Sequence, residues 1–139
     1  MAITCFLAGL IWVIQRVHYP LMSYVADDPF PEFEEKHCKR IGQIVLPAML
    51  LELSTSLLAL WYADSTPVFV TNLIGVLLLA IIWCSTFAIQ VPIHNRLGRM
   101  RNLADIEKLT STNWIRTSAW SLRALTSTLL VWQVGAGLK

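Results

Sequence analysis

Charged residues are scarce in this sequence. Only 14% of its 139 residues are Asp, Glu, Lys or Arg, and 55% are hydrophobic, whereas a soluble domain usually carries about 25% charged residues. Residues 68–91 contain no charged side chain, and roughly 20 apolar residues suffice for a helix to cross a bilayer. The composition excludes an ordinary soluble domain and indicates an integral membrane protein in contact with the lipid bilayer. No nucleic-acid partner is expected.

Cysteine is scarce as well. Cys5, Cys38 and Cys84 are isolated in the sequence, and no Cys-x-x-Cys pair occurs. This spacing excludes a disulfide framework and a zinc site built from thiolates alone. The chain also lacks the basic start and the small-residue cleavage site of a secretory signal peptide. We therefore expect the apolar N-terminal run to remain as a membrane helix.

Four apolar runs are long enough to cross a bilayer when some tilt is allowed. They do not alternate between apolar and polar residues as barrel strands do, so helices are predicted. The predicted fold is all-α: a single domain, residues 1–139, forming a four-helix transmembrane bundle with an up-down-up-down path. We expect residues 31–40 to continue the second helix beyond the membrane, and residues 103–109 to form a short surface helix. The predicted spans are residues 2–25, 41–63, 68–92 and 114–137.

Basic residues are concentrated at one end of this predicted bundle. Nine of the 11 Lys and Arg residues fall at the end with the two long connections, residues 26–40 and 94–113. The positive-inside rule makes this end cytoplasmic, together with the surface helices, and leaves both termini outside. We expect a multi-pass protein of a bacterial inner (plasma) membrane. The nine residues are Arg16, Lys36, Lys39, Arg40, Arg96, Arg99, Arg101, Lys108 and Arg116.

The three histidines occupy equivalent places in this topology. His18 lies at the cytoplasmic end of the first helix, His37 at the cytoplasmic start of the second, and His94 at the cytoplasmic end of the third. Because successive helices run in opposite directions, all three fall at one level of the bundle. Polar residues within membrane segments usually face the bundle interior and often serve function. We therefore predict that the histidines meet in one site rather than anchor helix ends separately.

Amide side chains accompany the histidines. Gln15 precedes His18 by three residues and Gln90 precedes His94 by four, so each pair is expected to share a helical face. The fourth helix begins at the same level with Asn113. The amides can orient imidazole rings by hydrogen bonding, and the two glutamines are therefore predicted cofactor-binding residues.

These residue types favour a transition-metal site. Neutral imidazole binds iron, copper or zinc, and a carboxylate can complete the ligand set. Glu34 lies three residues before His37, a Glu-x-x-His spacing that di-iron bundles also use, but the carboxylates are too few for two irons. We predict one metal held by His18, His37, His94 and Glu34. Cys38 could be a soft ligand, but it points about 100° away from His37 on a helix. An alternative is a b-type haem held by two histidines, such as His18 and His94.

Two opposite charges lie deeper in the predicted membrane region. Glu52 falls near the middle of the second span and Arg123 near the middle of the fourth. A lone charge at the bilayer centre costs about 2.5–3.5 kcal/mol on insertion scales. We expect the two to form a structural ion pair, which would reduce that cost.

The second half of the chain resembles a known family. The segments VPIHNRL (91–97) and TNWIRTSAW (112–120) are similar to the Val-Pro-x-x-Asn-x-Leu and Asn-x-x-Arg-Thr patterns of the anthrone oxygenase-like small membrane proteins. This resemblance implies a four-helix integral membrane protein that oxidises a hydrophobic phenolic or quinone-like compound. The segment RVHYP (16–20) instead resembles a group of uncharacterised bacterial membrane proteins with the same layout. The positions matching the family patterns are Val91, Pro92, Asn95, Leu97, Asn113, Arg116 and Thr117.

Two classes of function remain open at this point. In the first, the protein is a membrane oxidoreductase or oxygenase-like protein whose metal activates oxygen or polarises a carbonyl. Its catalytic residues would be Arg116 and Asn113, which would position a lipophilic small molecule entering from the bilayer. In the second, the protein is a non-catalytic accessory subunit of a larger membrane complex, respiratory or photosynthetic. A homo-oligomer is a further expectation.

Overall fold

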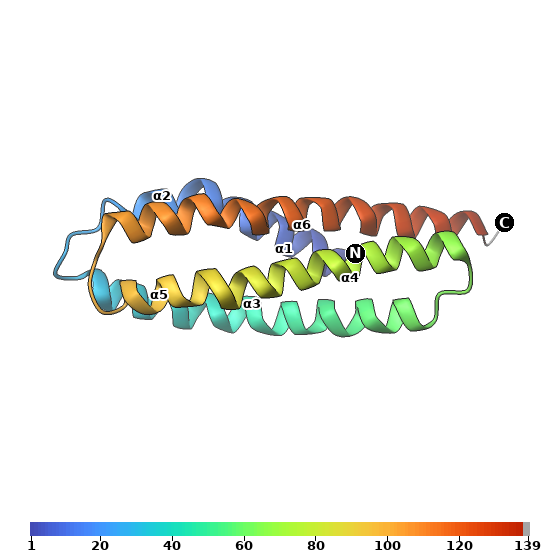
Figure 1. Ribbon diagram of the computed structural model, residues 1–139, viewed down its shortest axis with the longest axis horizontal. Coiled ribbons are helices and arrows are strands. Elements are labelled where there is room, and N and C mark those ends of the chain that lie inside the picture. Colours follow the sequence, from blue (N-terminus) through green and yellow to red (C-terminus); the bar gives the residue numbers. More distant parts are fainter. Residues whose placement is uncertain (138–139) are drawn as a thin grey trace.

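The computed structural model describes residues 1–137 and shows four long helices packed side by side as a bundle (Figure 1). The fold is all-α, as predicted. The connections lie alternately at the two ends of the bundle, so successive helices run in opposite directions (Figure 1). The first helix is built from α1, η1 and α2, and the third from α4, η2 and α5. The elements are α1 (Ala2–Val13), η1 (Ile14–His18), α2 (Tyr19–Met22), α3 (Phe30–Trp61), α4 (Thr66–Ser85), η2 (Thr86–Gln90), α5 (Val91–Leu97) and α6 (Leu103–Gly137).

Three of the helices are long and apolar enough to cross a membrane, and the protein is a multi-pass membrane protein. They are Ala2–Met22, Phe30–Trp61 and Thr66–Leu97. The fourth predicted span lies within α6, which is equally long but less apolar because Ser, Thr and Arg occur along it. α6 packs against α1 and α4, and its polar residues Thr117 and Arg123 are buried.

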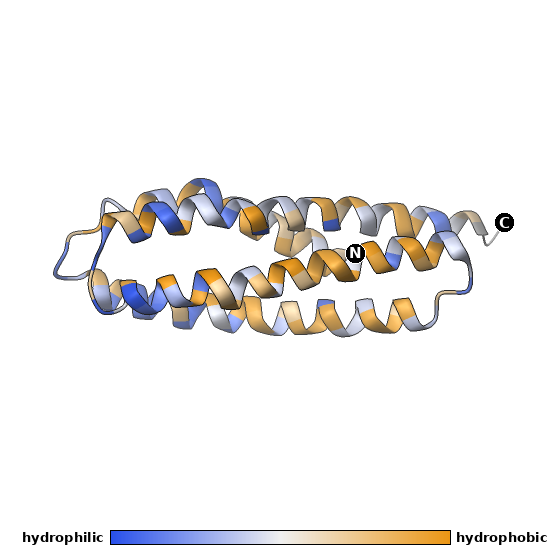
Figure 2. Cartoon of the chain, in the orientation of Figure 1, coloured by the Kyte–Doolittle hydropathy of each residue, from blue (hydrophilic) through white to orange (hydrophobic). Residues whose placement is uncertain are grey.

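The outside of the bundle is largely apolar, whereas many buried residues are polar. Figure 2 shows hydrophobic residues along the helices and hydrophilic ones gathered near the two long connections. Large apolar side chains such as Leu50, Leu58 and Leu77 are exposed, whereas Gln15 and Asn113 are buried. A helix surrounded by lipid needs partners for its polar groups inside the bundle. This distribution is the one expected of a protein whose outer surface contacts lipid.

Two helices extend beyond the predicted spans. α3 begins at Phe30, which confirms that residues 31–40 continue the second helix. Its 32 residues rise by about 48 Å, more than the roughly 30 Å of the hydrocarbon core. Residues 103–109 are helical as predicted, but they run without a break into α6 rather than forming a separate surface helix. Asn102 caps this helix, because its side-chain oxygen accepts hydrogen bonds from the backbone of Ala104 and Asp105.

A π-helical turn interrupts both the first and the third helix. The backbone N–H of Tyr19 donates to the carbonyl of Ile14, and that of Val91 to the carbonyl of Thr86. A proline, which has no N–H and clashes with the preceding turn of an α-helix, comes after each of these wide turns at Pro20 or Pro92. The extra residue in each turn rotates the next part of the helix by about 100°.

This rotation separates two residues that the sequence spacing places together. Gln15 hydrogen-bonds to α6, whereas His18 stacks on Phe33 and His37 of α3. The prediction that Gln15 and His18 share one face is therefore wrong, because regular α-helical spacing does not hold through η1.

A buried ion pair joins α3 to α6 near mid-bundle. Arg123 Nη2 lies 3.0 Å from Glu52 Oε1, and both side chains are at most 6% exposed, which confirms the predicted pairing. Thr4 donates to the Glu52 carboxylate at 2.8 Å, and Arg123 donates to Ser56 at 2.6 Å. Gly75 makes room for this pair, since a Cβ there would collide with the Arg123 guanidinium.

Candidate functional site

The three histidines lie together at the end of the bundle that carries the long connections. The rings of His18 and His37 are stacked, with centroids 4.1 Å apart and planes 19° from parallel. The centroid of His94 lies 5.7 Å from that of His37. Three helices thus bring their imidazoles into one cluster, at the common level that the topology predicts.

His94 is the best-connected member of this cluster. Its Nδ1 hydrogen-bonds to Glu34 Oε1, and its Nε2 lies 3.1 Å from the Tyr19 hydroxyl. An ionised carboxylate can only accept, so Nδ1 donates to Glu34. In a neutral ring Nε2 then accepts a hydrogen bond from the Tyr19 hydroxyl. Both partners fix the orientation of the His94 ring. None of the hydrogen bonds among residues 1–137 joins a histidine to Gln15, Gln90 or Asn113, so the structure does not bear out their predicted orienting role.

Glu34 is the centre of a group that could hold a metal ion. It is fully buried, and its Oε1 also accepts from the Cys38 thiol at 3.3 Å. One ligand atom each from Glu34, Cys38 and His94 lie within 4.8 Å of one another. The other carboxylate oxygen, Oε2, is buried without a partner among the described residues. Oxygen, sulfur and nitrogen atoms that can bind a metal thus lie close together, and one carboxylate oxygen has no hydrogen bond within this part of the chain.

This group differs from the predicted ligand set in two places. Cys38 belongs to it, because it lies one helical turn after Glu34 and shares that face of α3. Its angle to His37 argued against Cys38 as a ligand, whereas its Glu-x-x-x-Cys spacing from Glu34 is the signal that could have found it. His18 and His37 lie beside the group as a stacked pair and are not part of it. Tyr19, which no sequence pattern singled out, contacts His94 directly.

A second polar chain connects the first helix to α6. Gln15 is 2% exposed, donates to the Thr110 carbonyl at 3.0 Å and accepts from Asn113 at the same distance. Asn113 in turn accepts from Arg116 Nη1 at 3.2 Å. Gln15 and Asn113 therefore hold the Arg116 side chain in place and do not contact the imidazoles through hydrogen bonds within residues 1–137.

Arg116 is a buried cation without an acidic partner. Its side chain is 7% exposed, and none of the ion pairs formed within residues 1–137 includes it. Its Nε is buried and has no hydrogen-bond partner in the part of the chain that the structure describes. A buried polar group without a partner is costly, and a buried charge more so. Arg116 is therefore a candidate ligand-binding residue.

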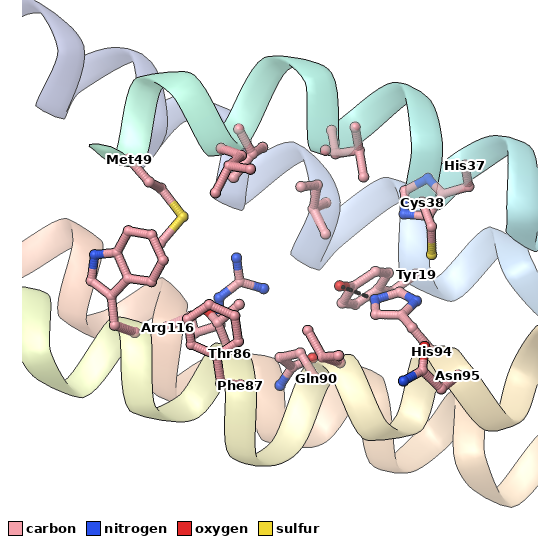
Figure 3. Close-up of a pocket in the computed structure, with 17 residues that line it drawn as sticks. Tyr19, His37, Cys38, Met49, Thr86, Phe87, Gln90, His94, Asn95 and Arg116 are labelled. Atoms are coloured by element: carbon pink, nitrogen blue, oxygen red, sulfur yellow. Dashed lines mark hydrogen bonds between the residues drawn. The ribbon is translucent and has the colours of Figure 1, made fainter. Parts of the chain in front are cut away.

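A cavity of about 300 Å³ lies between α3 and the third helix, with Arg116 reaching into it from α6 (Figure 3). This volume is at the lower end of the range of about 300–1,000 Å³ for small-molecule sites. Its rim includes Leu46 and Phe87, which are 50% and 59% exposed on the outer surface, so the cavity opens sideways towards lipid. Its apolar lining includes Val45, Met49 and Trp83, and its polar lining includes Tyr19, Gln90, His94 and Arg116.

Gln90 completes the polar part of the cavity. It is 1% exposed and donates from Nε2 to the Thr112 hydroxyl at 3.2 Å. Its carbonyl oxygen is buried, with no hydrogen-bond partner in residues 1–137. The cavity therefore presents an unused acceptor on Gln90 as well as an unused donor on Arg116.

Comparison of the chain with protein-family models, curated proteins and solved structures gives no match in any of the three. The function of the chain must therefore be inferred from the geometry of the site itself.

Proposed function

We propose that this protein is a membrane oxidoreductase, oxygenase-like in character, that acts on a lipophilic phenolic or quinone-like compound beside a transition-metal site. The proposal depends on one observation: the candidate metal group and the cavity share a residue. His94 belongs both to the candidate metal group with Glu34 and Cys38 and to the lining of the cavity that holds Arg116.

The donor set fits a transition metal. Imidazole and thiolate suit iron, copper and zinc, and a carboxylate can complete the shell. The free Oε2 of Glu34 supplies an additional donor, and His37 is the nearer of the two remaining histidines, 5.7 Å from His94 between ring centroids. We propose iron, copper or zinc bound by Glu34, Cys38 and His94, with His37 completing the set. When bound, such a metal would supply oxygen activation or carbonyl polarisation.

The cavity fits the proposed compound. Its apolar walls suit an aromatic ring, and a lipophilic molecule can reach it from the bilayer past Leu46 and Phe87. A phenol hydroxyl can donate to the free Gln90 oxygen, and a carbonyl oxygen can accept from Arg116. Asn113 acts as a positioning residue, because it holds Nη1 of Arg116. The Tyr19 hydroxyl, bonded to His94, is placed to give or take a proton on the cavity side.

Elemental analysis and an absorption spectrum of gently purified protein test this proposal. We expect about one iron, copper or zinc ion per chain and no haem absorption. Metal-free protein from cells supplied with all three metals would contradict it. A Soret band would favour the b-type haem alternative.

Closing the cavity tests the role of its opening. Gly42 lines the cavity, and a Cβ there meets no atom within 4 Å. A Gly42→Leu side chain should therefore occupy the entrance without disturbing the fold. The added side chain takes volume that the ligand would occupy. A loss of about 1 kcal/mol of binding free energy is about fivefold, so we expect affinity for 2-methyl-1,4-naphthoquinone to fall at least about fivefold. Fluorescence quenching would measure this.

Gly9→Leu is the matched control, since a Cβ at Gly9 also meets nothing within 4 Å and Gly9 does not line the cavity. Equal loss of affinity in both variants would show that the probe binds elsewhere.

A further inference from the structure

Arg116 differs from the other deeply buried arginine of α6. Arg123 has Glu52 as its counter-ion, whereas none of the ion pairs within residues 1–137 includes Arg116, which hydrogen-bonds to the neutral Asn113 amide. The Glu34 carboxylate faces His94 and Cys38, which both hydrogen-bond to its Oε1, and it forms no ion pair with Arg116 among the described residues. The negative charge that a buried guanidinium needs is thus not supplied by these groups.

The unused side of Arg116 has a defined shape. Asn113 takes Nη1, and the buried Nε has no partner. In a guanidinium, the Nε–H and one Nη2–H point in parallel and match two neighbouring oxygens that share a negative charge. The indole N–H of Trp83, another residue of the cavity lining, is also buried and has no partner among the residues described. The cavity therefore has spare donors, which favours an oxygen-rich ligand.

We propose that the Nε edge of Arg116 is an anion subsite, and that the cavity binds a lipophilic organic anion with two neighbouring oxygens. A carboxylate and an ionised hydroxy-ketone both have this chemistry. The apolar body of the ligand lies against Val45, Met49 and Trp83 or extends past Leu46 into lipid. This inference rests on the proposed function for its cavity and narrows the ligand class, but it needs no metal.

Two pairs of probes test it on the full chain in uncharged detergent micelles. The first pair is 2-hydroxy-1,4-naphthoquinone, ionised at neutral pH, and the neutral 2-methyl-1,4-naphthoquinone. The second is dodecanoate and dodecanol, measured by competition. Protein treated with a chelator is used, so that metal binding cannot cause a preference. Quenching of tryptophan fluorescence reports binding, and micelle partition of each probe is the same for every variant.

We expect the wild-type protein to bind at least one anion about tenfold or more tightly than its neutral partner, as charge-assisted hydrogen bonds imply. Arg116→Gln should abolish that preference, and Arg116→Lys should keep part of it. Arg99→Gln, which removes an exposed charge, should leave it unchanged. Preference for both anions means that the subsite binds carboxylates and ionised hydroxy-ketones alike. Preference for one anion identifies which of these two groups the ligand carries.

Two results would overturn the inference: no anion preference in the wild-type protein, or a preference that survives Arg116→Gln. Because the measurement is made without metal, these results are independent of the metal content that tests the proposed function. Thermal unfolding shows whether the Arg116→Gln variant is folded. If it is not, the reduced anion preference expected of Arg116→Lys tests the inference instead.

Discussion

The His94→Ala variant is expected to lose its bound metal, with an apparent affinity lower by more than about 100-fold. His94 is the residue through which the Glu34–Cys38 pair of α3 meets the third helix. Loss of a residue that merely supports a ligand already costs about 10–100-fold in metal affinity, so loss of a ligand should exceed this. Cys38→Ala and Glu34→Gln should show losses of the same order. Metal content after dialysis against a buffer of fixed free zinc or iron measures the effect.

His18→Phe is the matched control for these variants. Phenylalanine can keep the stacking of position 18 on His37 and Phe33 but removes both ring nitrogens. If Glu34, Cys38 and His94 are the main ligands, His18→Phe should retain most of the metal. A loss in His18→Phe and His37→Phe as large as in His94→Ala, with Cys38→Ala unchanged, would instead favour the ligand set predicted from the sequence.

The level of each residue along the bundle could be predicted, because helix rise and alternating direction determine it. This reasoning places His18, His37 and His94 together and pairs Glu52 with Arg123. The apolar runs identify the helices, since a bilayer requires long apolar segments. The end of the first helix differs, because Met22 rather than residue 25 is its last helical residue.

The direction in which each side chain points could not be predicted. The π-helical turns rotate one part of a helix against the other, and Pro20 and Pro92 are the only local signs of them. Gln15 consequently faces α6 and supports Arg116 through Asn113 instead of contacting a histidine. The contact of Tyr19 with His94 also depends on this rotation. The cavity depends on how side chains from different helices pack, which no single segment of the sequence determines.

Arg123→Gln is expected to lower the free energy of unfolding by about 3 kcal/mol, because it leaves the buried Glu52 carboxylate without its counter-ion. Glu52→Gln should cost a similar amount, since it leaves Arg123 unpaired. The double variant should recover part of the loss, because neither uncompensated charge remains. Reversible unfolding in mixed micelles of mild detergent and dodecyl sulfate would measure all three values.

The stability of Arg116→Gln should be compared with that of Arg123→Gln. Arg116 and Arg123 lie on the same helix and are 7% and 5% exposed, but among the ion pairs of residues 1–137 only Arg123 has an acidic partner. Removing the unpaired charge of Arg116 relieves a desolvation cost, so its variant should lose less than about 1 kcal/mol or become more stable. Equal destabilisation by both substitutions would mean that Arg116 also has a counter-ion within the protein. If Arg116→Gln keeps its stability but loses ligand binding, Arg116 serves the ligand rather than the fold.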